Sequence, residues 1–114
     1  MMPFNVQITD EKIRSGLLAL KPFFQKQIFT NRKAKHCLEA LEAIAQHKPF
    51  CHFLSVRLLG QLPAHNALYY NLLNHLNTQF KANGQVIVDL GDALSISLDD
   101  PMFINMAKSF GSKK

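Results

Sequence analysis

The hydrophobic pattern is clearest between residues 51 and 100, where it predicts a strand, a helix and a second strand. Residues 51–59 alternate imperfectly and place apolar side chains on both faces of a strand, which is typical of a central strand covered on both sides. After Pro63 the apolar side chains recur at helical spacing, and Asn83-Gly84 ends that helix in the left-handed conformation that glycine permits. Residues 86–90 then form the second strand. Because a helix separates the two strands, we expect them to run parallel, joined by a right-handed crossover.

The segment after Leu90 has two interpretations. Apolar side chains alternate with serines from Leu94 to Leu98, which predicts a strand that forms a hairpin with residues 86–90. A three-residue loop would set Val88 beside Ile96, whereas a two-residue turn would place the apolar side chains of the two strands on opposite faces. The alternative is an irregular connection to a helix that begins near Pro101. The clean alternation favours the hairpin, followed by a short helix and a basic tail.

The first fifty residues are predicted to be mainly helical. Residues 4–8 alternate apolar and polar side chains, as an edge strand does. Thr9 or Asp10 is expected to cap a first helix that ends near Lys21, and Pro22 can open a second short helix. Thr30 is the expected cap of a third helix, which extends to about Gln46 with apolar side chains at helical spacing.

These elements predict an α/β or α+β fold in one domain covering residues 1–114. The domain would consist of a mainly helical part (1–50), a strand–helix–strand unit with a hairpin (51–100), and a short helix and tail (101–114). The 114 residues are 47% apolar and 18% charged, which is ordinary for a globular protein large enough to bury a core. Helices are expected to cover a small mixed sheet whose centre is the parallel crossover.

Part of the strand–helix–strand unit resembles the STAS domain, the family of sulfate transporters and anti-sigma-factor antagonists. The similar segments are the seven residues from Val56 to Leu62, then a helix, then Val-Ile-Val-Asp-Leu at residues 86–90. The resemblance covers about residues 53–104. In that family a hydroxyl after an aspartate is a phosphorylation switch, but the corresponding segment here, Asp99-Asp100-Pro101, has no hydroxyl. The resemblance therefore implies a regulatory module without that switch.

The net charge of +5 is distributed unevenly along the chain. Residues 1–50 hold twice as many basic as acidic side chains, and basic residues crowd the start of the third predicted helix. The helix dipole is already positive there, so acidic residues would be favoured at that end. A cluster of cations beside free backbone N–H groups suits a phosphate or another anion. The hypothetical anion- or nucleic-acid-binding residues are Lys26, Arg32, Lys33, Lys35 and His36. The alternative is a solvated basic surface without a ligand.

The other reactive side chains do not form a recognisable catalytic or metal-binding motif. Asp89 and Asp92 follow a predicted parallel strand, where two carboxylates could hold Mg²⁺ in a small metal-assisted enzyme, although turn formation explains them more simply. The five histidines lack metal-ligand spacing, and Cys37 and Cys51 are expected to be reduced, buried thiols. The tyrosines and the nine phenylalanines are expected mainly in the core. We therefore predict no catalytic residue, no metal and no cofactor.

The sequence favours a small cytoplasmic, non-enzymatic module that binds a protein partner, either itself or another chain. The predicted contact is the edge of the last strand, which can accept a partner's strand. Its residues are Leu94, Ser95, Ile96, Ser97 and Leu98. The alternative is a protein that binds nucleic acid through the basic residues named above. A membrane partner is not expected, because no apolar run reaches the roughly 20 residues that cross a bilayer.

Overall fold

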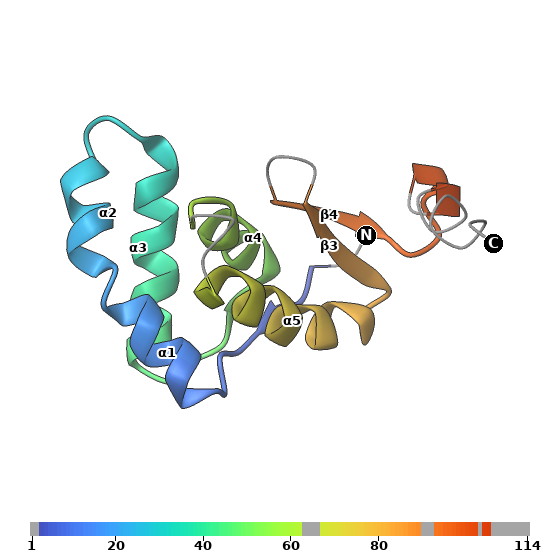
Figure 1. Ribbon diagram of the computed structural model, residues 1–114, viewed down its shortest axis with the longest axis horizontal. Coiled ribbons are helices and arrows are strands. Elements are labelled where there is room, and N and C mark those ends of the chain that lie inside the picture. Colours follow the sequence, from blue (N-terminus) through green and yellow to red (C-terminus); the bar gives the residue numbers. More distant parts are fainter. Residues whose placement is uncertain (1–2, 63–66, 90–92, 103, 106–114) are drawn as a thin grey trace.

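The computed structural model describes residues 3–62, 67–89, 93–102, 104 and 105. The fold is a single α+β domain with two small antiparallel sheets, as Figure 1 shows. In chain order the elements are β1 (Asn5–Val6), α1 (Glu11–Leu18), α2 (Lys21–Gln27), α3 (Arg32–Ala45), β2 (Phe50–Cys51), α4 (His52–Gly60), α5 (Ala67–Lys81), β3 (Gln85–Asp89) and β4 (Ala93–Ser97). The α+β alternative of the predicted fold class is therefore confirmed.

The first three helices begin largely where side-chain chemistry predicts. The Asp10 carboxylate accepts hydrogen bonds from the backbone N–H groups of Lys12 and Ile13, at 2.9 and 3.2 Å, and so caps α1. Pro22 lies in the first turn of α2, as expected. The predicted cap of α3 was wrong by one residue, because Asn31 accepts the Lys33 N–H at 3.0 Å. The Thr30 hydroxyl instead donates to a carbonyl at the end of α2.

The largest departure from prediction is α4, which occupies the segment expected to be a central strand. Only Phe50 and Cys51 are extended, and the helix begins at His52. The segment is buried along one face of the helix. Ser55, Leu58 and Leu59, at i, i+3 and i+4, all lie in the core. Periodicity alone cannot separate a short buried helix from a strand buried on both faces.

The predicted parallel crossover is consequently wrong, and so is the single mixed sheet. β1 pairs with β2, and β3 pairs with β4, both antiparallel. The predicted C-terminal hairpin is confirmed, with the apolar side chains of both strands on a common face. The register differs by two residues, since Val88 lies opposite Leu94 and not Ile96. Leu90, which the prediction also placed in this pairing, lies outside the described residues.

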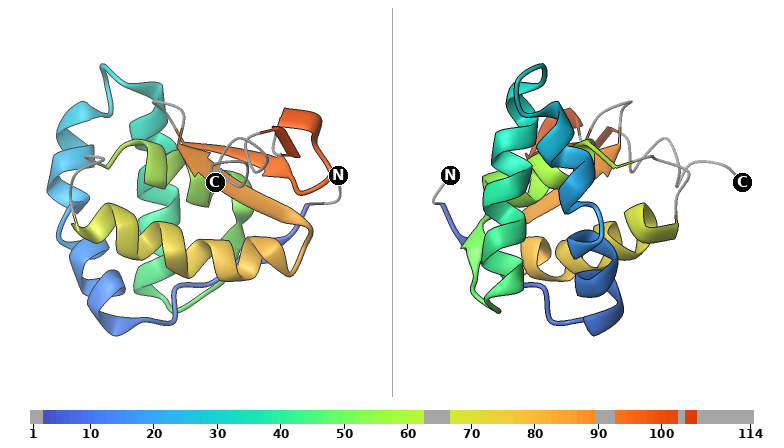
Figure 2. Two further views of the ribbon diagram at one scale, coloured as in Figure 1. Left: turned by 45° about the vertical axis from the view of Figure 1, so that its right-hand side comes forward. Right: turned by 90° about the vertical axis from the view of Figure 1, so that its left-hand side faces the viewer.

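Helix α4 lies at the centre of the molecule and positions the candidate site. It contacts α3, α5, β2 and β4, so it joins the helical half to the hairpin. Figure 2 shows α3 and the β3–β4 hairpin on opposite sides of α4, with α5 running beneath the hairpin. The buried core includes Leu17, Leu41, Leu58, Leu72 and Phe80, contributed by α1, α3, α4 and α5. No helix in the described part of the chain is long and apolar enough to span a membrane.

Candidate functional site

The outer edge of β4 presents free backbone groups at one residue in particular. In an antiparallel pair, residues alternate between those that bond to the partner strand and those whose N–H and C=O point away. The Leu98 N–H donates to the Gly84 carbonyl at 3.0 Å, which fixes the alternation. Leu94 and Ile96 therefore bond to β3, and the backbone groups of Ser95 and Ser97 point outward.

The side chains around β3 support this assignment. Ile87, which lies opposite Ser95, directs its backbone groups away from β4, where the Asn77 side chain binds both of them. On β4 the Ser97 carbonyl accepts the Asp100 N–H at 3.0 Å and is thus occupied. Ser95 is therefore the residue in the middle of β4 whose N–H and C=O both face away from β3. Its hydroxyl donates to the Gln85 side chain at 3.0 Å, which anchors the residue from the other strand.

A pocket adjoins the strand at this residue. Its cavity volume is about 380 Å³, within the range of pockets that hold small molecules or side chains. Its walls come from the start of α3, from α4 and from the first half of β4. The lining residues are Lys33, His52, Phe53, Val56, Arg57, Gly60, Gln61, Ala93, Leu94 and Ser95. The pocket thus combines apolar walls, two basic side chains and a strand residue with unpaired backbone groups.

Arg57 supplies the positive charge on the α4 side of the pocket. Its guanidinium carbon lies 4.9 Å from the centre of the Phe53 ring, so the cation is stacked on an aromatic face. No carboxylate of the described residues forms an ion pair with Arg57. Stacking leaves the edge of the guanidinium plane, with its N–H donors, able to bind a carboxylate in the bidentate manner. His36 of α3 contacts the same Phe53 ring edge-on, at 5.6 Å between ring centres.

The thiol behind the pocket is not reactive. Burial of Cys37 raises its pKa to about 11, against a smaller opposing effect of the positive charges of Arg57 and Lys33. Its Sγ lies 3.8 Å from the Arg57 carbonyl oxygen and donates to it. Both cysteines are free; Cys37 is buried, as predicted, whereas Cys51 is only half-buried. Because only the thiolate is nucleophilic, Cys37 packs the α3–α4 interface as a neutral group.

The structure separates the predicted basic cluster into two groups. Lys33 lines the pocket and His36 lies against Phe53, whereas Lys26, Arg32 and Lys35 are exposed at the end of the α2–α3 hairpin. The Nδ1 atom of His36 is buried and has no hydrogen-bond partner among the described residues. The Lys33 N–H at the start of α3 is already bound by Asn31, so it is not free to bind an anion.

One feature of the site could not be found from the prediction of a strand over residues 51–59. Arg57 and Phe53 come together because they are four residues apart on a helix. Exposed aromatic rings also occur outside the site, since Phe23, Phe29 and Tyr70 are 47%, 96% and 52% exposed, and Phe53 within it is 47% exposed. The expectation that aromatic residues lie mainly in the core is wrong for these four.

The candidate metal residues are only partly described. Asp92 lies outside the described residues, as does the side chain of Asp89, so the hypothesis of a metal-assisted enzyme stays a prediction. Asp100 accepts the Met102 N–H at 2.8 Å, which is a capping role. Among the described residues, no group of three or more histidine, cysteine or acidic side chains could hold a metal ion.

Comparison with protein-family models, with curated proteins and with solved structures found no match for this chain. The resemblance to the STAS domain therefore stays a prediction from the sequence.

Proposed function

We propose that this protein is a non-enzymatic binding module that takes up a short extended segment of a partner protein beside β4. The observation that carries the proposal is the position of Ser95, whose outward N–H and C=O adjoin a pocket of about 380 Å³. Extended peptides bind exposed strand edges by backbone hydrogen bonds, and pockets for alternate side chains supply the specificity. The two free thiols support a reducing compartment, and we assign the protein to the cytoplasm on that basis.

The hydrogen bonds within the hairpin limit which backbone groups of β4 a partner segment can bind. Leu94 and Ile96 use their backbone groups to bind β3, Leu98 donates its N–H to Gly84 just before β3, and the Ser97 carbonyl is occupied. The originally predicted contact over all five residues from Leu94 to Leu98 is therefore narrowed to Ser95 and its immediate surroundings. We expect two backbone hydrogen bonds with the partner, each contributing about 1 kcal/mol.

The chemistry of the pocket defines the partner's side chains. Phe53, Val56 and Leu94 offer apolar walls, and burying one aliphatic side chain of the partner would contribute about 1.5–3 kcal/mol. Arg57 favours a carboxylate next to that side chain, because a stacked guanidinium binds carboxylates in a fixed plane. The favoured segment is thus short, extended and both apolar and acidic.

The proposal is tested by titrating the protein with short, end-blocked peptides in which an apolar residue and a glutamate are two positions apart, so that both side chains of the extended segment face the pocket. Binding is measured by backbone amide shifts in NMR spectra. Peptides with glutamate should bind at least several-fold more tightly than the same peptides with glutamine. Arg57→Gln should abolish this preference while leaving weak binding of the apolar residues.

A basic side chain elsewhere provides the control for net charge. Lys48 is exposed beyond the end of α3, and Lys48→Gln changes the charge by the same amount without touching the pocket. The glutamate preference should survive in Lys48→Gln. Equal loss in both variants would show a general charge effect, and absence of any shift around Ser95 in the original protein would refute the proposal.

A further inference from the structure

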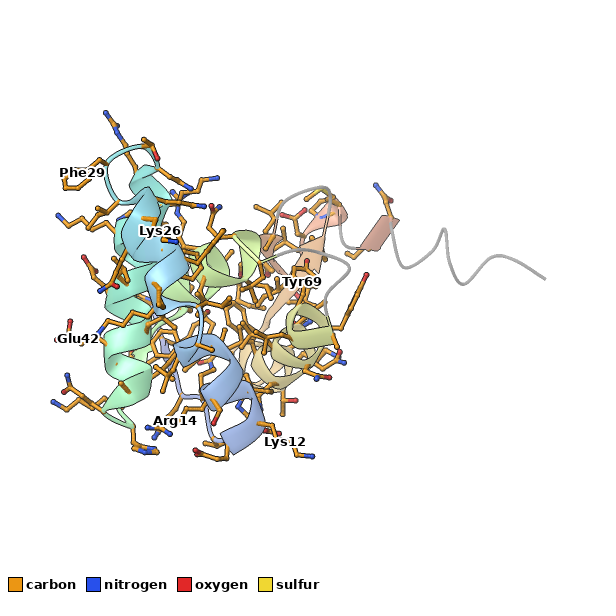
Figure 3. The ribbon with its side chains drawn as sticks, turned by 60° about the vertical axis from the view of Figure 1, so that its left-hand side comes forward. Lys12, Arg14, Lys26, Phe29, Glu42 and Tyr69 are labelled. Carbon is orange, nitrogen blue, oxygen red and sulfur yellow. The ribbon has the colours of Figure 1, made fainter. Side chains whose placement is uncertain are left out.

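A second surface lies at the end of the α2–α3 hairpin and consists of residues that do not line the pocket. We call it the hairpin tip, and it consists of Lys26, Ile28, Phe29, Arg32 and Lys35. Phe29 is 96% exposed, and Ile28 beside it is 39% exposed. Figure 3 shows the Phe29 ring pointing away from the body of the protein at the end of the hairpin, where several nitrogen-tipped side chains also extend.

The exposure of Phe29 is built into a hydrogen-bonded turn. The Gln27 carbonyl accepts the backbone N–H groups of Thr30 and Asn31, at 3.0 and 2.8 Å, and the Thr30 hydroxyl at 3.3 Å. Asn31 also ties the turn to α4 through its amide, which donates to the Gln61 side chain at 2.9 Å. The chain is thus fixed on both sides of a ring that contributes nothing to the core. Covering such a ring with a partner would be favourable, because it removes apolar surface from water.

The charged side chains near this ring along the chain are all basic. Every charged residue from Lys12 to Leu38 is Lys or Arg, so no carboxylate in that stretch neutralises the tip. Lys26, Arg32 and Lys35 are all exposed, and Arg32 and Lys35 lie three residues apart on one face of α3. The dipole of α3 adds positive potential at the same end. The complementary partner is therefore a polyanion.

We infer that the hairpin tip binds single-stranded nucleic acid, with an unpaired base stacked on Phe29 and neighbouring phosphates on Lys26, Arg32 and Lys35. Proteins that bind single strands combine a basic track with aromatic rings on which bases stack. A duplex buries the faces of its bases, so a protruding phenylalanine can stack on them only after a base step has been unstacked, which costs a few kcal/mol. An anionic membrane is the less favoured partner, because one fully exposed apolar side chain makes a marginal anchor. The inference is independent of the proposed function of the pocket.

The inference is tested by fluorescence anisotropy with a labelled single-stranded oligonucleotide of about 12 residues, its duplex, and vesicles of phosphatidylserine and phosphatidylcholine in equal amounts. The single strand should bind at low salt and more tightly than the duplex. Phe29→Ala should weaken the single-strand complex between about fivefold and a hundredfold, the range measured for losing one stacked base. The variant should keep its melting temperature, because Phe29 is 96% exposed.

Matched variants separate the tip from the rest of the surface. Tyr70→Ala removes an aromatic ring that is 52% exposed on α5, outside the tip, and single-strand affinity should not change. Replacing Lys26, Arg32 and Lys35 by Ala should reduce the slope of log affinity against log salt by about 2, because three phosphate contacts are lost. Lys12, Lys48 and Lys81 are exposed elsewhere on the protein. Replacing these three by Ala should leave most of the slope of log affinity against log salt unchanged.

Several outcomes would overturn the inference. One is the absence of single-strand binding at low salt, and another is equal affinity for the duplex. A third is a Phe29→Ala variant that binds the single strand as tightly as the original protein. Vesicle binding that depends on Phe29, without binding to the oligonucleotide, would assign the tip to a membrane surface instead.

Discussion

At the scale of single residues, amide side chains of α5 replace the strands that the two small sheets lack. Asn77 accepts the Ile87 N–H at 2.7 Å and donates to the Ile87 carbonyl at 3.3 Å. Gln79 makes the same pair of bonds with Gln7 after β1, at 2.9 and 2.8 Å. Because a side-chain amide carries both an acceptor oxygen and an N–H donor, it can bind the N–H and the C=O of one residue at a strand edge. These bonds satisfy backbone groups that burial would otherwise leave unpaired.

Replacement of Asn77 by Leu should therefore destabilise the fold by about 2 kcal/mol. Leu has a similar branched shape, but it leaves the N–H and C=O of the buried Ile87 without a partner. The free energy of unfolding in urea measures the effect. Asn74→Leu, at an exposed position on the same helix, is the control and should change stability by no more than about 0.5 kcal/mol. Equal stability of the two variants would show that the Asn77 bonds contribute little.

The sequence could predict some residue roles but not others. The Asp10 cap was predictable because its bonds are to the next few residues in the chain. The role of Asn77 was not, since its partner lies ten residues away on a strand that must first be placed. The exposure of Phe29 could not be predicted either, because it depends on the hydrogen-bonded turn in which the residue lies.

At the scale of elements, the sequence predicted α1, α3, α5 and the hairpin, and failed at α4. The long helices have wide polar faces, which make the helical period visible. α4 is short and apolar, so its sequence pattern fits a buried helix and a buried strand equally well. Its composition contained the missing signal, because leucine predominates and Val56 is its single β-branched residue. Because a strand was predicted there, the stacking of Arg57 on Phe53 was not predicted.

The contact between α1 and α5 depends on Gly16. A Cβ atom at Gly16 would lie 3.0 Å from Leu68 Cδ1, which is the far end of a flexible side chain. Gly16→Ala should therefore be nearly neutral, because the gain in helix propensity of about 1 kcal/mol offsets the closer contact. Gly16→Leu cannot fit between the helices and should destabilise the protein by about 1–3 kcal/mol. Urea midpoints measure both, and a Leu variant as stable as the Ala variant would contradict this account of the contact.

At the scale of the whole molecule, α4 brings together residues from three parts of the chain. Lys33 comes from α3, Arg57 from α4 and Ser95 from β4, and all three line the pocket. The sequence identified Lys33 and Ser95 as members of two separate hypothetical sites. Their proximity could not be predicted, because it depends on α4 filling the space that a parallel sheet would have occupied. The hairpin tip is a distinct surface, at the end of the α2–α3 hairpin that points away from α4 (Figure 1).

The central claim is that a partner segment bonds to the outward backbone groups of Ser95, and a proline pair tests it most directly. Proline removes an N–H, and at Ser95 and Ser97 the lost N–H faces away from β3, so the β3–β4 ladder stays intact. Ser95→Ala serves as the control for loss of the hydroxyl bond to Gln85. The measurement is the affinity of the glutamate-containing peptides by NMR titration. We predict that Ser95→Pro weakens binding about tenfold, while Ser97→Pro and Ser95→Ala bind as the original protein does. Unchanged affinity in Ser95→Pro, in a variant that remains folded, would contradict the claim.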